Sequence, residues 1–547
     1  MKVDQQGVGC LAGSPRMLQL QSIRMFASQT RATRAATWVA LGSAGRVLVQ
    51  IAQVAILTRL LSPDDFGIMA IVMVVASVGS LFSDGGLSSA FLQRRDVPDD
   101  ARSSLYWLNV ALALGVGIMV VLLAPGISWI YGEPALTGVM IASTPVFVLG
   151  ALGRQFEVAS EKSLRFGNLV LIELCAALLG AGTALGGALL GWQAYALVAA
   201  ALVSAAVRSL LAFVVLAGGW RPSLRLRWSD VQPYVGFGSA NLASNLVNQL
   251  NASVDLILGG RLLGLDALGL YSVPRSLVLN VQNAVNPVVT RVGFPVIAEV
   301  QHDRDAVLRA YQGIVRVVAL VGAPIYAGIA VLSKDICHVL LGPTWTDAST
   351  TLTILACWGY FRSLSNPAGA LLLGVGRADV ALRWNIALLL VYPAGLWVGA
   401  QWGPNGLATG LLCTSALLLI PGWRWLVFPH TGWAAPDFTR TILTPATVAA
   451  AAWAVSSVIT APDTCSSWRA LLTTTVSIAA YTGVMWTAAR LRSLQTLIRV
   501  GRQRGAHDAG TPEHVDESDS CAQRGGGAGR DIMTFVTLRK EPSNIDT

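Results

Sequence analysis

Long runs of apolar residues, separated by short polar stretches, dominate the pattern of the chain. Each run has about 20 residues, the length that an α-helix needs to cross the hydrocarbon core of a bilayer. The pattern therefore predicts an all-α polytopic membrane protein with about fourteen transmembrane helices. The expected spans are residues 36–59, 66–84, 104–124, 135–153, 168–190, 193–217, 236–260, 268–292, 311–333, 348–373, 380–401, 405–427, 441–461 and 470–490.

Basic residues collect in every second loop between these spans, as is typical of cytoplasmic loops. With the N-terminus inside, the inside loops contain Arg94, Arg95, Arg102, Arg154, Lys162, Arg165, Arg221, Arg225, Arg227, Arg304, Arg309, Arg377, Arg383, Arg424 and Arg440. The outside loops hold little beyond Arg59, Arg261, Lys334 and Arg469. Both ends are therefore predicted to be cytoplasmic, with an N-terminal segment over 1–35 and a disordered tail over 491–547.

A nine-residue phrase occurs twice in the chain. Residues 59–67, Arg-Leu-Leu-Ser-Pro-Asp-Asp-Phe-Gly, return as residues 261–269, Arg-Leu-Leu-Gly-Leu-Asp-Ala-Leu-Gly, an offset of 202 positions (261 minus 59). Six further spans lie between the copies, and an even number of crossings indicates a parallel internal repeat. We therefore predict two six-helix bundles over 36–220 and 221–430, followed by two additional helices over 431–490.

Polar residues line one face of the first span of each half. At the offset of 202, Arg46, Gln50 and Gln53 align with Asn248, Ala252 and Asp255, with i, i+4, i+7 spacing. The face in the second half is widened by Asn241, Asn245, Gln249 and Asn251. Polar side chains in hydrocarbon are costly unless satisfied, so these faces should point at protein or at an aqueous cavity. Hydrogen bonding between helices is the alternative interpretation, with about even odds for a lone amide.

Three arginines fall within predicted spans, at Arg46, Arg275 and Arg362. Asp255 can neutralise one of them and Glu173 another, which leaves the expected cavity net positive. Arginine binds phosphate through a planar fork, so such a cavity suits an anionic, hydroxyl-rich solute such as a phosphate-linked sugar. Arg275 has an alternative role in snorkelling towards the outer surface. Asn283 and Asn366 complete the candidate cavity residues.

Two further interpretations concern ions and gating. Asp255 or Glu173 is the candidate for a titrating group in a cycle coupled to H⁺ or Na⁺, and the sequence does not decide between proton, sodium and no coupling. Asp84 and Arg291 occupy matched positions in the two halves at an offset of 207 (291 minus 84), which suggests a cytoplasmic gate. The alternative is that each caps or solvates a helix end.

The composition excludes several other classes of protein. With 54% hydrophobic and 13% charged residues, the chain is unlike a globular protein, in which about a quarter of the residues are charged. The net charge of +9 follows from the loop pattern, so nucleic-acid binding is not expected. Seven cysteines without a C-x-x-C pair and five scattered histidines predict no metal site. No cofactor and no enzymatic chemistry are expected.

Several short motifs, in order from about residue 33 to 430, resemble those of the polysaccharide-transport flippases of the MOP exporter superfamily, especially colanic-acid-exporter-like members. They are Arg59-Leu60-Leu61-Ser62-Pro63-Asp64-Asp65-Phe66-Gly67, Asp84-Gly85-Gly86-Leu87-Ser88-Ser89-Ala90, Phe237-Gly238, Gly260-Arg261-Leu262-Leu263-Gly264, Leu268-Gly269-Leu270-Tyr271-Ser272, Phe294-Pro295, Leu341-Gly342-Pro343-Thr344-Trp345 and Gly374-Val375-Gly376-Arg377.

This resemblance implies a two-bundle fold like that of the multidrug MATE exporters. It also implies alternating access and export of an undecaprenyl-pyrophosphate-linked oligosaccharide across the bacterial inner membrane for exopolysaccharide, capsule or O-antigen synthesis. Membrane lipids, a polymerase and other polysaccharide-assembly proteins are the expected partners. In the related lipid II flippases two extra helices after the twelfth accommodate the lipid tail, which implies the same use for 431–490.

Two rival functions fit the same pattern of spans. A drug or cation antiporter on the same fold should have an acidic, aromatic cavity, whereas the predicted cavity is basic and rich in amides. A polysaccharide polymerase or ligase usually needs a large external loop, and the longest loop expected between spans has about 20 residues, too short for a folded module.

Overall fold

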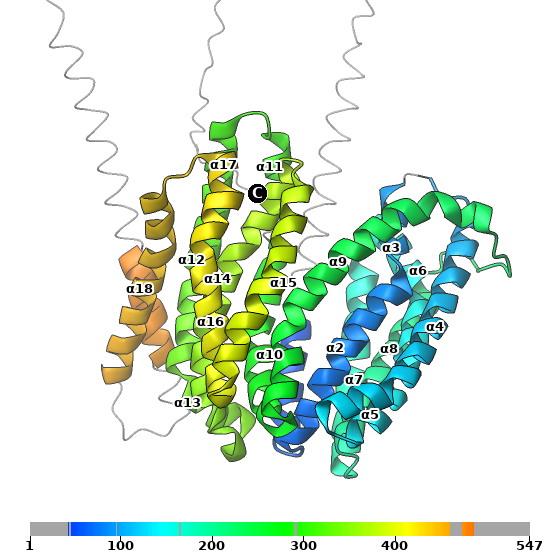
Figure 1. Ribbon diagram of the computed structural model, residues 1–547, viewed down its shortest axis with the longest axis horizontal. Coiled ribbons are helices and arrows are strands. Elements are labelled where there is room, and N and C mark those ends of the chain that lie inside the picture. Colours follow the sequence, from blue (N-terminus) through cyan, green and yellow to red (C-terminus); the bar gives the residue numbers. More distant parts are fainter. Residues whose placement is uncertain are drawn as a thin grey trace, which may run out of the picture. The chain divides into compact units, whose positions relative to one another are not determined.

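The computed structural model describes residues 42, 45–94, 96–163, 166–288, 293–459 and 473–485. All of them belong to one compact unit, Met1–Met485. Every regular element in these ranges is helical, which confirms the predicted all-α class. Figure 1 shows long helices that run roughly alongside one another.

The first half of the described chain forms a group of helices that pack on each other. α7 packs on α8, α8 on α6, α6 on α4 and α4 on α2. Proline or serine starts several of them: Ser62 caps α2 through a capping box with Asp65, and Pro145 begins α6 directly after α5. The elements are the first helix (Gly45–Leu57), α2 (Pro63–Asp84), α3 (Leu87–Gln93), α4 (Asp99–Tyr131), α5 (Ala135–Ser143), α6 (Pro145–Lys162), α7 (Phe166–Leu189) and α8 (Ala194–Leu216).

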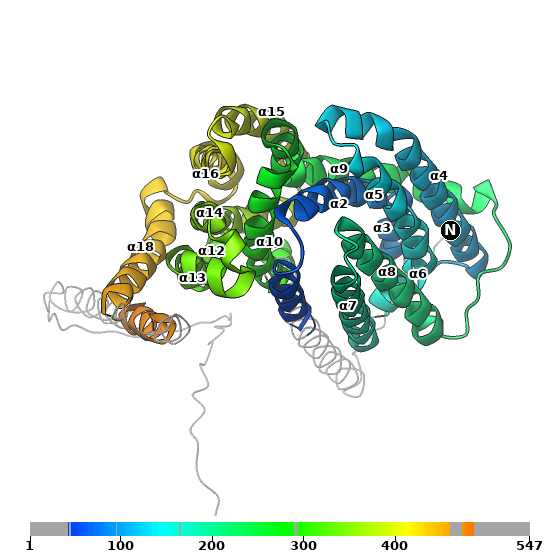
Figure 2. The same ribbon diagram turned by 90° about the horizontal axis from the view of Figure 1, so that it is seen from below.

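The second half forms a similar group in which α14 is central, since it contacts α10, α12 and α16. α18 packs on the outer side of α12, away from the first half (Figures 1 and 2). The elements are α9 (Trp228–Leu263), α10 (Leu265–Val288), α11 (Phe294–Glu299), α12 (Arg304–Val331), α13 (Ser333–Asp335), η2 (Ile336–Leu341), η3 (Pro343–Trp345), α14 (Ala348–Gly374), α15 (Ala378–Ala400), α16 (Gly403–Gly422), η4 (Trp423–Val427), α17 (Phe428–Thr431) and α18 (Ala435–Ile459), followed by helical residues 473–485.

The repeated phrase lies where the two halves touch. α2 packs along α10, and a glycine from each helix meets the backbone of the other. A Cβ atom on Gly67 would lie 1.9 Å from the carbonyl oxygen of Leu265, and one on Gly269 would lie 1.8 Å from that of Pro63. Leu265 and Gly269 are the residues 202 positions after Pro63 and Gly67, so the contact is reciprocal. The sequence repeat is therefore also a two-fold contact in space.

The apolarity of the helices identifies a multi-pass membrane protein. Among the described residues, eight helices are long and apolar enough to cross a bilayer, and the helix Gly45–Leu57 is apolar but shorter. A helix occupies each of the fourteen predicted segments. The full count of fourteen spans stays a prediction, because α9, α10, α14, α18 and residues 473–485 are not among those eight.

Candidate functional site

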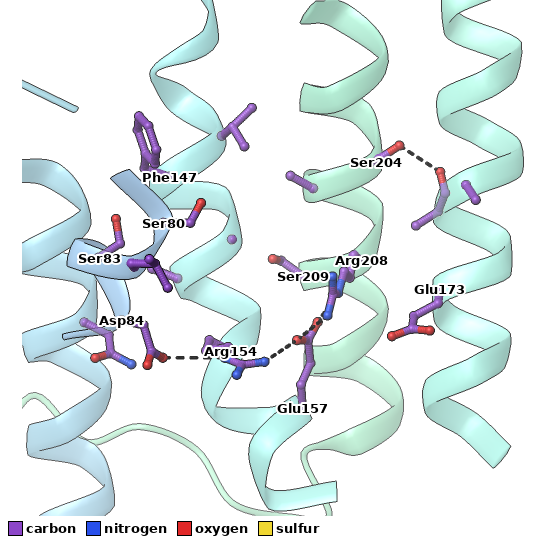
Figure 3. A pocket seen from close by; sticks show the side chains of 18 of the residues that line it. Ser80, Ser83, Asp84, Phe147, Arg154, Glu157, Glu173, Ser204, Arg208 and Ser209 are labelled. Atoms are coloured by element: carbon purple, nitrogen blue, oxygen red, sulfur yellow. Dashed lines mark hydrogen bonds and ion pairs between the residues drawn. The ribbon is translucent and has the colours of Figure 1, made fainter. Parts of the chain in front are cut away.

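A polar cavity of about 610 Å³ lies within the first half of the chain. Side chains from the first helix, α2, α3, α4, α6, α7 and α8 line it, and Asn245 of α9 reaches it from the second half. Serines and an alanine-rich wall of α7 and α8 alternate with charged residues around it (Figure 3). A charged cavity among membrane-spanning helices is costly to maintain, so its polar groups should compensate one another.

A chain of ion pairs crosses the cavity from α2 to α8 (Figure 3). Arg154 of α6 lies 3.6 Å from Asp84 at the end of α2 and 3.6 Å from Glu157 one helical turn further on. Arg208 of α8 completes the chain, because its Nη2 donates to Oε2 of Glu157 at 2.8 Å while its Nε donates to Oε1. This two-pronged geometry is the one by which arginine also binds phosphate.

A second ion pair lies on another wall of the same cavity. Arg46 of the first helix places its Nη1 3.3 Å from Oε2 of Glu173 on α7. The side chains keep 47% and 20% of their surface exposed, so this pair is wetter than the Glu157–Arg208 pair, in which the glutamate is 5% exposed. With Arg154, Arg208 and Asp84, the lining holds three arginines and three carboxylates. The cavity is therefore formally neutral, whereas the sequence predicted a net positive one.

An unpaired amide also lines the cavity. Asn109 of α4 is 1% exposed, and neither its Oδ1 nor its Nδ2 has a hydrogen-bond partner among the described residues. A buried amide without partners costs on the order of 1–3 kcal/mol. Because both atoms are buried, Asn109 can pair with a solute hydroxyl only when the lining of the cavity moves, and it then offers one acceptor and two donors.

The structure brings some of the residues predicted from the sequence to this cavity and places others elsewhere. Arg46, Glu173, Asp84 and Asn245 line it. Asn241 lies beside it on α9 and accepts a hydrogen bond from Asn245 at 3.4 Å.

Other predicted residues serve helix packing or lie on exposed surface. Gln249 donates to Ser77 of α2 at 2.8 Å and to Ser253 of its own helix at 3.0 Å. The first bond is the hydrogen bonding between helices that was the alternative interpretation for these amides. Gln53 lines a smaller apolar cavity between the first helix and α7. The remaining amides are exposed or half-buried: Gln50, Asn248, Asn283 and Asn366.

Asp255 and Arg275 form a separate, closed network in the second half. Arg275 Nη2 donates to Asp255 Oδ1 at 3.0 Å and also donates to the carbonyl oxygen of Ala252, while the Tyr271 hydroxyl donates to Asp255 Oδ2 at 2.8 Å. Arg275 is 9% exposed and Asp255 is 2% exposed. Arg275 therefore does not snorkel to a surface, and this pair is not part of the cavity described above.

Arg362 of α14 is paired differently. Its Nε donates to Oε1 of Gln282 at 3.1 Å, and its guanidinium lies 5.2 Å from the ring centroid of Trp358. No carboxylate within 4.0 Å of it is found in the described part of the chain. Of the two residues of the predicted gate, Arg291 lies outside the described residues. Asp84 pairs with Arg154.

Three residues that line the cavity were not predicted from the sequence as site residues: Arg154, Glu157 and Arg208. The loop pattern assigned Arg154 to the cytoplasm after a span that ended at 153, but α6 continues to Lys162 and carries both Arg154 and Glu157 one turn apart. Arg208 stands alone among apolar residues of α8, so an intramembrane charge was visible there as a signal for a functional site.

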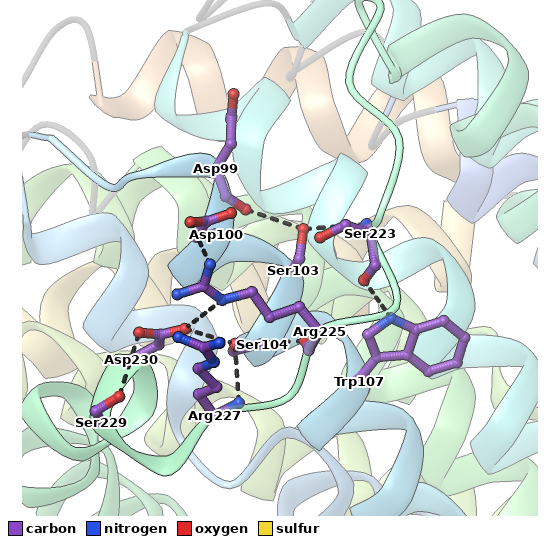
Figure 4. A network of polar contacts seen from close by, with 10 residues as sticks. All are labelled: Asp99, Asp100, Ser103, Ser104, Trp107, Ser223, Arg225, Arg227, Ser229 and Asp230. Atoms are coloured by element: carbon purple, nitrogen blue, oxygen red, sulfur yellow. Dashed lines mark hydrogen bonds and ion pairs between the residues drawn. The ribbon is translucent and has the colours of Figure 1, made fainter.

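A second polar network fixes the connection between the two halves (Figure 4). Arg225 binds Asp100 at the start of α4 at 2.6 Å and Asp230 at the start of α9 at 3.1 Å. Ser104 donates to Asp230 at 3.1 Å, and Trp107 donates through Nε1 to the carbonyl of Ser223 at 2.8 Å. The linker is therefore held against α4 by several side chains.

Comparison with known proteins identifies relatives and folds. A family model described as "Polysaccharide biosynthesis protein" matches residues 56–350. The teichuronic acid biosynthesis protein TuaB of Bacillus subtilis is 27% identical over 368 residues, 67% of this chain and 76% of the relative. The lipopolysaccharide biosynthesis protein WzxC of Escherichia coli is 27% identical over 398 residues, which cover 73% of this chain and 81% of the relative. The succinoglycan biosynthesis transport protein ExoT of Rhizobium meliloti is 25% identical over 402 residues, which cover 72% of this chain and 80% of the relative.

Two solved structures show the fold. The lipid II flippase MurJ in an inward closed conformation superposes with a TM-score of 0.68 at 14% identity, covering 83% of this chain and 98% of that one. An inward-facing multidrug MATE transporter of the MOP superfamily superposes with a TM-score of 0.56 at 15% identity, covering 71% and 95%. The predicted all-α, MATE-like membrane fold is thereby confirmed.

Proposed function

The chain belongs to the polysaccharide biosynthesis protein family, and from this premise we propose that it is a flippase for a lipid-linked oligosaccharide. It carries an undecaprenyl-pyrophosphate-linked repeat unit from the cytoplasmic to the outer leaflet of a bacterial inner membrane by alternating access. The N- and C-termini are cytoplasmic, and no covalent bond is made or broken. Synthesis of an exopolysaccharide, capsule or O-antigen is the process that consumes the product.

The observation that carries this proposal is the arginine set of the cavity. Arg46, Arg154 and Arg208 come from three different helices and converge on one volume of about 610 Å³. A diphosphate offers several anionic oxygens, and guanidinium groups bind such oxygens in pairs without losing their own charge when desolvated. Asn109 and the cavity serines supply donors and acceptors for sugar hydroxyls.

The names of the relatives point in the same direction. They are named as biosynthesis or transport proteins for teichuronic acid, lipopolysaccharide and succinoglycan. All three polymers are built from sugar units, and their assembly outside the cytoplasm requires that polar intermediates cross a bilayer. The proposed substrate class follows from this common chemistry together with the polar cavity.

The neutral charge balance of the cavity has a consequence for the transport cycle. A diphosphate must displace carboxylates from the arginines, because Asp84, Glu157 and Glu173 already occupy them. Proton or Na⁺ uptake by a displaced carboxylate compensates the added negative charge. Glu173 is the more suitable of the two coupling candidates, since Asp255 is enclosed with Arg275 outside this cavity.

The test is leaflet exchange in proteoliposomes with a fluorescent undecaprenyl-diphosphate oligosaccharide. Wild-type protein should accelerate the exchange, and a complete lack of acceleration with such lipids would overturn the proposal. Arg208→Lys keeps the charge beside Glu157 but removes the planar fork, so exchange should fall by about tenfold or more. Arg46→Gln should also slow it, while Arg261→Gln, an exposed arginine outside the cavity, is the matched control.

A further inference from the structure

An apolar seam runs from the polar cavity along the first helix and α7. Each helix contributes one face to it, at spacings of three or four residues. Two further cavities, of about 220 Å³ and about 510 Å³, continue the line of the polar cavity and share Ile56 and Leu185 with each other. The seam positions are Arg46, Val49, Gln53, Ile56 and Leu60 on the first helix and its end, and Glu173, Ala177, Ala181, Leu185 and Leu189 on α7.

The polarity of the seam changes along its length. At one end Arg46 and Glu173 form the ion pair of the polar cavity. Beyond them, all side chains that line the smaller cavity except Gln53 are apolar, and the last cavity adds Arg59 among aliphatic residues. From residue 173 to residue 189 the seam rises about 24 Å along α7 at 1.5 Å per residue. It is therefore a long apolar groove with a charged head.

The first helix and α7 touch before the apolar groove and again near its other end, where Leu57 packs with Ala184 and Ala188, and they leave an unfilled space between these contacts. At one end a Cβ on Gly42 would lie 2.4 Å from Val170, and one on Gly45 would lie 3.1 Å from Leu174, so the helices touch. Further along, a Cβ on Gly182 would meet nothing within 4 Å. Figure 2 shows the first helix, in dark blue, alongside α7. The separation leaves Leu178 58% exposed and Leu189 68% exposed.

We propose that this seam holds the polyprenyl chain of the lipid-linked substrate while the diphosphate and sugars occupy the polar cavity. The inference rests on the proposed function and deepens it. The occupant must be a long, flexible hydrocarbon that is covalently joined to a multiply charged anion, because the apolar groove and the Arg46–Glu173 end of the polar cavity follow one another along the same two helices. A polyprenyl diphosphate has this chemistry, whereas a phospholipid has a single diester phosphate for a cavity with three arginines.

The proposal places the lipid tail in the first half of the chain. The resemblance described above implied that helices over 431–490 accommodate it instead. α18 packs on α12 in the second half, and the polar cavity lies among helices of the first half. A tail bound along α18 would therefore not be continuous with Arg46 and Glu173, while a tail in the seam is.

Filling the seam is the direct test. Gly182→Leu places a side chain into the groove at a position where added atoms meet no protein, so folding should be retained. Exchange of an undecaprenyl-linked oligosaccharide should slow by about tenfold or more, because the occupant and the new side chain compete for one volume. Exchange of an analogue with a short prenyl chain should change by less than about twofold. Gly115→Leu on α4, also exposed and with nothing within 4 Å of an added Cβ, is the matched control.

Photo-crosslinking with a polyprenyl diphosphate that carries a diazirine in its tail locates the occupant directly. The label should appear in peptides that contain Leu178 and Leu185, and unlabelled polyprenyl diphosphate should compete while phosphatidylglycerol should not. Equal competition by phosphatidylglycerol would overturn the proposal in favour of a bilayer lipid, and a label confined to 435–459 would overturn it in favour of α18.

The two proposals fail in different ways. If wild-type protein exchanges the lipid and Gly182→Leu exchanges it equally fast, the seam assignment is wrong and the flippase function stands. If wild-type protein exchanges nothing while the tail still labels the seam, the binding site stands and the transport function is wrong.

Discussion

Replacing Gly67 or Gly269 by alanine tests whether the repeated phrase holds the two halves together. Real Cβ atoms essentially never approach another heavy atom within 3.0 Å, and the added Cβ would lie 1.9 Å and 1.8 Å from the opposing carbonyl oxygens. The helices must therefore separate by at least 1.1 to 1.2 Å, the differences between 3.0 Å and those distances. A backbone cannot rotate away from the clash as a flexible side chain can.

The energetic effect follows from the size of that separation. A gap of about 0.5–1 Å already forfeits a quarter to a half of the dispersion energy between facing atoms, and overpacked sites typically lose ~1–3 kcal/mol. Alanine regains ~1 kcal/mol through its higher helix propensity than glycine. A separation of more than 1 Å places both sites at the upper end of that range, so each substitution should lower the free energy of unfolding by about 2 kcal/mol (about 3 minus about 1).

The assay is denaturant unfolding in mixed micelles, followed by circular dichroism, for both single variants and the double variant. Gly126→Ala on α4 is the control: its Cβ would meet nothing within 4 Å, so only the favourable helix propensity remains and stability should rise slightly. The double variant should be less destabilised than the sum of the singles, because one separation relieves both clashes. Unchanged stability in Gly67→Ala and Gly269→Ala, or strict additivity, would refute the reciprocal contact.

Three further predictions concern groups outside the proposed cavity. Asp255→Asn should lower the free energy of unfolding by about 3–5 kcal/mol, because Arg275 stays buried without a counter-charge; adding Arg275→Met should recover part of the loss. Cys337, fully buried, should resist iodoacetamide at pH 8 until denaturation, as judged by mass spectrometry, since burial raises the pKa of its thiol to about 11 and leaves about one thiolate in a thousand. Arg225→Ala should speed chymotryptic cleavage of the linker at Leu224 and Leu226, two sites that the substitution leaves in place, while the free energy of unfolding changes by less than about 1 kcal/mol, because Arg225 and Asp100 are 32% and 58% exposed. Cleavage at the wild-type rate would contradict a linker held by this residue.

The helical architecture was predictable because apolar length is a local property of the sequence. Within the described residues each predicted span is largely helical, even where a polar face interrupts it, as in α9. The boundaries were less accurate where charges lie inside a helix. The predicted span 135–153 is two consecutive helices, α5 and α6, and the second continues to Lys162 because Arg154 and Glu157 neutralise each other within it.

The pairing of charges required the tertiary structure. The sequence showed that Arg46 and Arg275 need counter-charges and named Glu173 and Asp255 as the available ones, and the structure forms these two pairs. It could not show that only the first pair lines the polar cavity, because the enclosure of Asp255 and Arg275 depends on how the helices pack. The sequence predicted one cavity containing Arg46, Arg275 and Arg362. Local sequence patterns could not decide this, and only Arg46 lines the cavity.

The repeat relates the two halves in their backbone but not in their charge. The offset of 202 that brings Gly67 onto Gly269 grows along the chain: α8 begins at Ala194 and its counterpart α16 at Gly403, which is 209 positions later (403 minus 194). An added Cβ on Gly410 of α16 would lie 2.5 Å from the carbonyl oxygen of Gly395 on α15, so these two helices pack closely. Close glycine packing occurs in both halves, since a Cβ on Gly180 of α7 would also meet Ser204 of α8, so the difference lies in the charged residues. α8 carries Arg208, whereas α16 has no charged residue. The asymmetry of the site thus arises within a symmetric scaffold, which is why the repeat located the contact between the halves and misled about the contents of the cavity.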